Sequence, residues 1–321
     1  MLVEEFQDDK FVFGSDLSSN SLSGSIPESI GNLTAIRELT LSNNNFTGNV
    51  LSTISKLNKL VHLGLSNNHF QGSFPESIGN FTAIIELRLS GNNFTGNVPS
   101  TISKLKELVY LDLSSNHFGD SIPESIGNLT AIRELGLSDN SFTGNVPSTI
   151  GKLNNIEYLF LSSNNFEGSI PGIFTNFSEL SILAFDSNNF TGSFPYSVAT
   201  LTSLRMLELQ NNLLTGPLPS NISGLQELQQ LDLSFNYFTG ATPLWLFCLP
   251  SLISLSVQDN QLTGKLPNEL KSNYLEYLQY GGLMFLLEKP KWYVNFAEDI
   301  AQQIAAKKRT RQKKRRQRRM N

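Results

Sequence analysis

Leucines and asparagines recur along this chain at a fixed spacing of 24 residues. An asparagine occupies every twenty-fourth position from Asn20 to Asn260, which gives eleven positions without a slip. Around each asparagine runs the pattern L-x-x-L-x-L-x-x-N-x-[LF]-x-G-x-[IVFL]-P, as in residues 84–99. A fixed period of this length is typical of a solenoid in which each repeat forms one coil.

Each repeat predicts one short strand. Leu87 and Leu89 alternate with polar neighbours, so both point to one side of the strand and the residue between them faces solvent. No strand buries its apolar face alone, but coils stacked at about 4.8 Å close a shared core. The predicted fold class is therefore an α/β solenoid with a parallel β-sheet on its concave side and about 11 repeats of 24 residues.

The recurring asparagine is predicted to join neighbouring coils. Its primary amide offers two donors and an acceptor with two lone pairs. It can satisfy loop backbone groups in its own coil and the next, and each such group costs about 1–3 kcal/mol when left unpaired. We expect this structural role at Asn44, Asn68, Asn92, Asn116, Asn140, Asn164, Asn188, Asn212, Asn236 and Asn260.

The longer pattern L-x-x-L-x-L-x-x-N-x-L-x-G-x-I-P-x-x-I-G-x-L resembles the plant-specific class of leucine-rich repeats. That class includes ectodomains of receptor-like kinases and receptor-like proteins, and polygalacturonase-inhibiting proteins. The resemblance covers about Leu17 to Leu270. It implies a right-handed superhelix with a second short strand near residues 94–96. The chain departs from the class in lacking the cysteine pairs that close each end, since Cys248 is its single cysteine.

We divide the chain into four parts. The end coils of a solenoid expose an apolar edge that has to be capped. The expected parts are a divergent N-terminal cap (1–16), the leucine-rich-repeat domain (17–270), a cover for the C-terminal edge (271–290), and an amphipathic helix with a basic tail (291–321).

The last part combines an apolar stripe with a block of positive charge. Trp292, Phe296, Ile300 and Ile304 are spaced by four residues, which predicts an amphipathic helix from about Lys291 to Lys307. Residues 307–319 contain ten Lys or Arg and no acid, so the rest of the chain has 24 − 10 = 14 basic against 28 acidic residues. An anionic membrane surface or a solvated terminus is favoured for this tail, and nucleic acid is disfavoured.

Enzyme chemistry receives little support. His69 and His117 are copies of one exposed repeat position, and no cluster of carboxylates is expected near His62. Cys248 lies among apolar residues and is predicted to be a buried structural thiol. No glycine-rich phosphate loop is present, because the glycines follow the repeat period. We expect no enzyme activity, no cofactor and no metal.

Function is therefore expected at the solvent-facing positions of the concave strands. Aromatic and apolar residues gather there in the middle repeats, and acids surround them, Asp139 and Asp186 included. Exposed aromatics on a rigid sheet are typical of binding hot spots, and acids favour a basic or polar partner. The candidate ligand-binding residues are Tyr110, Asp112, Glu134, Tyr158, Phe160, Ile182, Met206, Glu208 and Asp232.

Eight Asn-x-Ser/Thr sequons are a separate signal, although repetition copies one sequon several times. They are candidate glycosylation sites if the chain is secreted. The positions are Asn32, Asn45, Asn80, Asn93, Asn128, Asn176, Asn189 and Asn221. The resemblance implies a cell-surface, plasma-membrane or secreted location. The alternative is cytoplasmic, since the sequence shows no signal peptide and no apolar run long enough for a transmembrane helix.

The favoured function is a non-catalytic recognition module in receptor-like signalling or defence. It would bind a peptide, protein or glycan on its concave face, and a co-receptor is a further candidate partner. Two alternatives remain open: an enzyme inhibitor similar to the polygalacturonase-inhibiting class, and an intracellular scaffold held at membranes by the tail.

Overall fold

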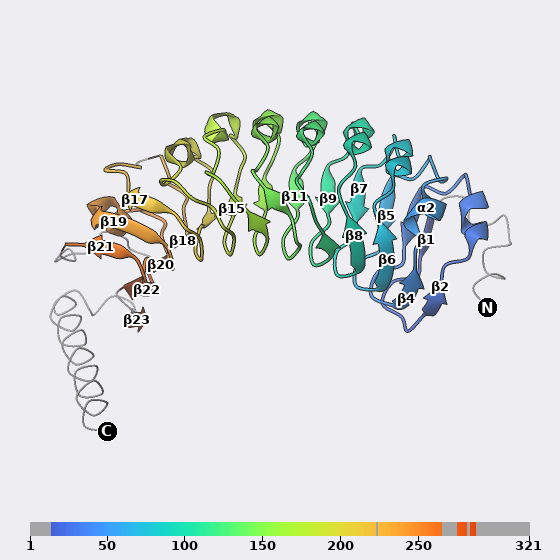
Figure 1. The fold of residues 1–321 in the computed structure, drawn as a ribbon, viewed down its shortest axis with the longest axis horizontal. Helices are drawn as coiled ribbons and strands as arrows, with labels where there is room; N and C mark the ends of the chain where they lie inside the picture. Colours follow the sequence, from blue (N-terminus) through green and yellow to red (C-terminus); the bar gives the residue numbers. More distant parts are fainter. Residues whose placement is uncertain (1–13, 223, 265–274, 281–282, 287–321) are drawn as a thin grey trace, which may run out of the picture.

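The computed structural model describes residues 14–222, 224–264, 275–280 and 283–286. These residues form one curved stack of coils, with the helical turns along the outer side of the arc (Figure 1). Successive coils contribute one strand each to a long sheet of parallel strands. The predicted solenoid is confirmed.

The long sheet has 13 strands among the described residues, and every pair but the last is parallel. Neighbouring strands pair at a spacing of 24 residues, so Glu38 pairs with His62 and His62 with Glu86. The last parallel step is shorter, because Ser254 pairs with Tyr277. The strands are β1 (Gly14–Asp16), β3 (Glu38–Thr40), β5 (His62–Gly64), β7 (Glu86–Arg88), β9 (Tyr110–Asp112), β11 (Glu134–Gly136), β13 (Tyr158–Phe160), β15 (Ile182–Ala184), β16 (Met206–Glu208), β18 (Gln230–Asp232), β20 (Ser254–Ser256), β22 (Tyr277–Tyr280) and β23 (Leu283–Leu286).

A second strand follows the recurring asparagine in most coils, as the resemblance to plant-type leucine-rich repeats implies near residues 94–96. These strands make three smaller parallel sheets among the described residues. They are β2 (Ser23–Ser25), β4 (Asn45–Gly48), β6 (His69–Ser73), β8 (Asn93–Gly96) and β10 (His117–Phe118); β12 (Thr143–Gly144) and β14 (Asn165–Phe166); and β17 (Thr215–Pro217), β19 (Tyr237–Ala241) and β21 (Gln261–Thr263).

Short helical turns return the chain along the outer side. Most are 3-10 helices entered through a proline, whose fixed φ suits the start of a helix. Where Leu51 replaces that proline, the turn is a short α-helix instead, α2 (Leu51–Ile54). The 3-10 helices are η1 (Glu28–Asn32), η2 (Glu76–Asn80), η3 (Ser100–Lys104), η4 (Glu124–Asn128), η5 (Ser148–Lys152), η6 (Phe174–Asn176), η7 (Tyr196–Thr200) and η8 (Leu244–Phe247). Within the described part of the chain, no helix has the length and apolarity to cross a membrane.

A column of stacked phenylalanines forms part of the core. It comes from the position two residues after the asparagine, and its rings are fully buried from Phe46 to Phe190. Successive rings stack with centroids 6.0 to 6.3 Å apart. Because each ring contacts the ring of the next coil, the column holds neighbouring coils in one register.

The recurring asparagines join adjacent coils as expected for a buried amide. The Nδ2 of Asn92 donates to Leu65 O at 3.0 Å in the preceding coil and to Leu89 O at 3.1 Å in its own. Its Oδ1 accepts from Phe70 N at 3.0 Å. The same contacts repeat from Asn44 to Asn260. The amides therefore satisfy backbone groups that no regular strand or helix pairs.

The residue before each of these asparagines adopts a left-handed backbone conformation, with φ between 51° and 66°. Small polar residues or glycine fill nearly all of these positions, and such residues tolerate this region best. Phe235 is the exception, at φ 52° with a half-exposed ring.

The structure describes only part of the two end segments of the expected division. Gly14–Asp16, assigned to the N-terminal cap, form β1 and pair with β3. Residues 1–13 of that cap lie outside the described residues, as do the predicted helix and tail at 291–321. Within the segment expected to cover the C-terminal edge, β22 and β23 form the last two strands of the long sheet.

The prediction that Cys248 is buried is wrong, because its side chain is exposed. It is the capping residue after η8, whose residues Trp245, Leu246 and Phe247 are buried. A 3-10 turn directs successive residues around its axis, so an apolar run along the sequence does not place every member in the core.

Candidate functional site

The first position of each concave strand forms a row across the sheet. Tyr158 pairs with Ile182, and Ile182 with Met206, so these three side chains lie on adjacent strands. All three are half-buried. Phe160, two residues along β13, packs its ring on Tyr158 with centroids 6.4 Å apart and nearly parallel planes. These four residues form a continuous apolar surface on the concave face.

Tyr110 does not join this surface, although the sequence placed it in the same patch. Glu134 lies between Tyr110 and Tyr158 in the row, because β11 separates β9 from β13. The guanidinium of Arg88 instead lies over the ring of Tyr110, and its Cζ is 5.6 Å from the ring centroid. Tyr110 is therefore part of a charged cluster and not of the apolar surface.

Arg88 is at the centre of that charged cluster on β5 to β11. It donates to Glu86 on its own strand and, at 3.4 Å, to Glu134 two strands away. Burial acts to lower the pKa of Arg88, but hydrogen bonding to Glu86 and the charges of Glu134, Glu86 and Asp112 raise it overall. Burial acts to raise the pKa of Glu86, but hydrogen bonds and charge from Arg88 and His62 lower it overall.

A single carboxylate lies near His62: its Nδ1 is 3.2 Å from Glu86 Oε2, since the two residues pair on adjacent strands. His69 and His117 are exposed, as predicted. Ion pairs and hydrogen bonds join the side chains of this cluster, and the described residues contain no group of three or more His, Cys, Asp or Glu side chains placed to hold a metal.

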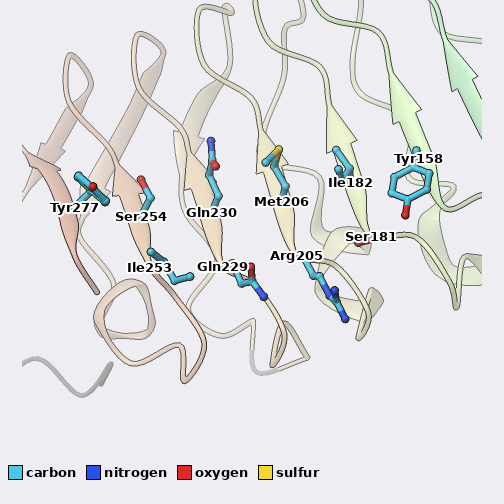
Figure 2. A pocket seen from close by; sticks show the side chains of 10 residues that line it. All are labelled: Tyr158, Ser181, Ile182, Arg205, Met206, Gln229, Gln230, Ile253, Ser254 and Tyr277. Atoms are coloured by element: carbon cyan, nitrogen blue, oxygen red, sulfur yellow. The ribbon is translucent and has the colours of Figure 1, made fainter. Parts of the chain in front are cut away.

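The apolar surface continues into a hollow towards the C-terminal end of the sheet. This concave hollow has a volume of about 550 Å³ and spans β13 to β22. Figure 2 shows that its side chains form two rows, one from the strands and one from the residues just before them. The strand row is Tyr158, Ile182, Met206, Gln230, Ser254 and Tyr277, and the second row is Ser181, Arg205, Gln229 and Ile253.

The hollow is bounded by aromatic rings. Tyr158 and Tyr277 stand at its two ends, and the smaller or flexible side chains of the intervening coils line the surface between them. Among the described residues that line it, Arg205 is the only charged one, and it is exposed. No carboxylate of the described residues lies within ion-pair distance of Arg205, whereas Arg133, in the same position three coils earlier, pairs with Glu157.

Sequence reasoning identified part of this hollow and missed the rest. Tyr158, Ile182 and Met206 were among the predicted residues. The row before the strands was not considered, although its members also recur at 24 residues. Tyr277 was missed because the last step is 23 residues and breaks the period.

The predicted acids Glu208 and Asp232 lie beside each other at the last positions of strands β16 and β18, next to Asp186. Burial and the charges of Asp186 and Asp232 raise the pKa of Glu208. Burial also raises the pKa of Asp232, with a further contribution from Asp186, although hydrogen bonds from Ser234 and Ser256 oppose it. Gln230 donates to Glu208 at 2.9 Å, so this acid has a neutral partner.

Asp112 lies outside the hollow, in the charged cluster around Arg88. Its Oδ1 accepts from Ser114 N at 3.0 Å, which fixes the carboxylate at the end of β9. Of the nine predicted ligand-binding residues, three line the hollow, Phe160 adjoins it, and the other five belong to the two charged groups.

The eight sequon asparagines are all exposed, in contrast to the buried asparagines that join the coils. Four follow or end a helical turn on the outer side at steps of 48 residues: Asn32, Asn80, Asn128 and Asn176. None of the eight lines the concave hollow, so glycans at these positions would leave it open.

Comparison with protein families and known structures agrees with the architecture. A family described as a leucine-rich repeat region matches residues 17–141. The single-repeat family, Leucine Rich Repeat, matches residues 131–153, 155–177, 203–225, 227–249 and 251–273. No curated protein matches the sequence.

Solved structures that resemble the chain include plant receptor ectodomains. The plant peptide hormone receptor RGFR1, in complex with RGF2, is 29% identical with a TM-score of 0.75, over 82% of this chain and 46% of that one. The Arabidopsis receptor kinase HAESA, in complex with the peptide hormone IDA and the co-receptor SERK1, is 32% identical with a TM-score of 0.78, over 83% and 45%. A plant ice-binding protein is 28% identical with a TM-score of 0.64, over 71% and 74%. The chain thus spans less than half of the two receptor ectodomains.

Proposed function

The chain belongs to the plant-type leucine-rich-repeat proteins, and from this premise we propose that it is a non-catalytic recognition module that binds an extended peptide on its concave face. The peptide crosses strands β13 to β22 and places an apolar side chain in the concave hollow. The observation that carries the proposal is the hollow itself, with Tyr158, Ile182 and Met206 half-buried along its floor.

The chemistry of the surface supports a peptide in preference to a purely polar ligand. Partly exposed aromatic and aliphatic residues in a concave site are the residues that dominate binding energy in protein interfaces. The sheet is rigid, because the buried asparagines and the phenylalanine column fix each coil to the next. A preformed surface loses little conformational entropy when the ligand binds.

The similar receptor ectodomains support the same class of ligand. RGFR1 and HAESA were each determined with a peptide hormone, and their concave architecture is shared with this chain at TM-scores of 0.75 and 0.78. By this likeness, we further propose a receptor-like role at the cell surface or outside the cell, with a protein co-receptor as a second partner.

The test is selection from a displayed random-peptide library against the immobilised full chain, followed by calorimetry with the selected peptides. The double variant Tyr158→Ala, Met206→Ala should weaken binding tenfold or more, which corresponds to about 1.4 kcal/mol or more. The control is Tyr196→Ala, because Tyr196 is 56% exposed on η7, on the outer side of the arc. If the selected peptides bind the double variant and the control equally well, the proposal is refuted.

Two further measurements distinguish the possible locations of the chain and the alternative functions that remain. Expression in a plant host, followed by enzymatic removal of N-linked glycans, should lower the mass if the exposed sequons are used. A mass that does not change would favour the intracellular scaffold. Inhibition of a polygalacturonase by the purified chain would favour the inhibitor.

A further inference from the structure

We propose that the peptide held by the concave hollow carries a lysine or arginine within two residues of its apolar side chain, and that Asp186, Glu208 and Asp232 bind this cation. We call these three residues the acidic group. The proposal rests on the proposed function, because it states which peptides the concave face accepts.

The acidic group adjoins the hollow on the same strands. Met206 lines the hollow and Glu208 is the last residue of the same strand, β16, with the buried Leu207 between them. Gln230 and Asp232 repeat this arrangement on β18. Two positions of a strand face the same side and lie about 7 Å apart, and two residues of an extended peptide span the same distance. A peptide with an apolar side chain over Met206 can therefore bring a neighbouring side chain to Glu208.

The described part of the chain supplies no cation to the acidic group. None of its three carboxylates lies within ion-pair distance of a described Lys, Arg or His. Arg205 precedes Glu208 by three positions, or about 10 Å of strand, and makes no ion pair with it. The carboxylates accept hydrogen bonds from neutral groups: Asp186 from Ser162 and Ser187, Glu208 from Gln230, and Asp232 from Ser234 and Ser256. Their negative charge is therefore available to a ligand.

The charged cluster around Arg88 shows what the acidic group lacks. Arg88 is the last residue of β7, as Glu208 is of β16, and it donates to Glu86 and Glu134. Burial acts to raise the pKa of Glu86, yet hydrogen bonds and charge from Arg88 and His62 lower it overall. The pKa of Glu208 is instead raised by burial and by the neighbouring acids. A basic side chain of the ligand would supply the charge that Arg88 supplies in the other cluster.

A buried acceptor beside the acidic group also lacks a donor. The side-chain oxygen Oε1 of Gln210 is buried and has no hydrogen-bond partner within the described ranges. Gln210 follows Glu208 by two positions, and its backbone oxygen accepts from Ser187 N at 2.9 Å, so it lies beside the coil of Asp186. An ammonium group offers three donors and a guanidinium five, and neither accepts a hydrogen bond. A basic side chain can therefore satisfy Gln210 together with the carboxylates.

The test repeats the random-peptide selection on the full chain and on the variant Asp186→Asn, Glu208→Gln, Asp232→Asn. These changes remove the charges and keep the shapes of the side chains, and urea unfolding verifies that the variant is folded. Peptides selected on the wild type should contain Lys or Arg within two residues of an apolar residue. In calorimetry they should bind the variant at least about tenfold more weakly. Replacing the basic residue of the peptide by norleucine should weaken binding to the wild type similarly and leave binding to the variant unchanged.

A matched control separates local contact from attraction by net charge. Glu28→Gln, Glu76→Gln, Glu124→Gln also removes three negative charges, from exposed residues in the first turns of η1, η2 and η4. These turns lie on the outer side of the arc (Figure 1). The control should keep the affinity of the wild type within about twofold. An equal loss in the control and in the acidic-group variant would overturn the proposal.

The other outcomes distinguish this proposal from the proposed function. Selected peptides that lack Lys and Arg, or that bind the acidic-group variant as tightly as the wild type, overturn this proposal and leave the proposed function standing. Peptides that bind Tyr158→Ala, Met206→Ala as tightly as the wild type refute both, as does a selection that yields no peptide. Saturable binding of calcium chloride alone, lost in the acidic-group variant, would mean that the carboxylates hold a metal ion instead.

Discussion

Replacing one buried asparagine should reveal how much a single amide contributes to the joining of two coils. Asn92 is 6% exposed and makes hydrogen bonds to both its own and the preceding coil. Asn92→Leu keeps the branching and the number of heavy atoms of the side chain, removes its donors and acceptor, and leaves no space for a water molecule. The loss therefore includes the hydrogen bonds, and the somewhat larger volume of leucine adds to it.

The magnitude follows from which groups keep a partner. Leu65 O still accepts from Asn68 at 3.1 Å, and Leu89 O still accepts from Asn116 at 3.0 Å. The N–H of Phe70 loses its bond to Asn92 Oδ1 and is buried. One unpaired buried donor costs about 1–3 kcal/mol, and the lost bonds to carbonyls add about 1 kcal/mol. We expect the free energy of unfolding to fall by about 2–4 kcal/mol.

The assay is urea unfolding by circular dichroism together with hydrogen exchange of the backbone segment that contains Phe70. Exchange is needed because long repeat arrays can unfold in parts. The control is Asn93→Leu, one residue further along on β8, where the side chain is exposed. It should change stability by no more than about 0.5 kcal/mol. A cost for Asn92→Leu no larger than that of the control, with unchanged exchange at Phe70, would refute the reasoning.

Two other predictions concern charge and backbone strain. Burial and the charges of Asp186 and Asp232 raise the pKa of Glu208 in the folded state, so the folded chain binds the proton of this carboxyl group more tightly than the unfolded chain does. The folded chain therefore loses stability as the pH rises from the ordinary glutamate pKa through the raised one. Glu208→Gln should therefore be more stable than the wild type at neutral pH and equal to it below the ordinary glutamate pKa; a gain that is constant in urea unfolding across pH would contradict this. Asn211 has φ 54° and an exposed side chain, so Asn211→Phe should cost about 1 kcal/mol in thermal or urea unfolding, since a bulky residue is strained in this region. Asn211→Asp is the control, because Asp139 and Asp259 occupy the same position in other coils, and equal stability of the two variants would argue against strain.

The sequence predicted correctly those features that repeat from coil to coil. The strand positions around Leu87 and Leu89 and the amide contacts of Asn92 depend on residues within one coil and on equivalent residues in the next, whereas the second strand at β8 was implied by the resemblance to plant-type leucine-rich repeats. The period of 24 residues therefore predicts these features directly, and a departure from the pattern in one repeat does not shift the prediction for the others.

Only the tertiary structure decided the features in which neighbouring coils differ. The concave hollow is lined by unlike side chains of successive coils between Tyr158 and Tyr277, and Tyr277 is out of period. The approach of His62 to Glu86 and the exposure of Cys248 also depend on how particular side chains are directed. Repetition determines where a backbone goes, whereas the shape and charge of its surface depend on unlike side chains that only stacking brings together.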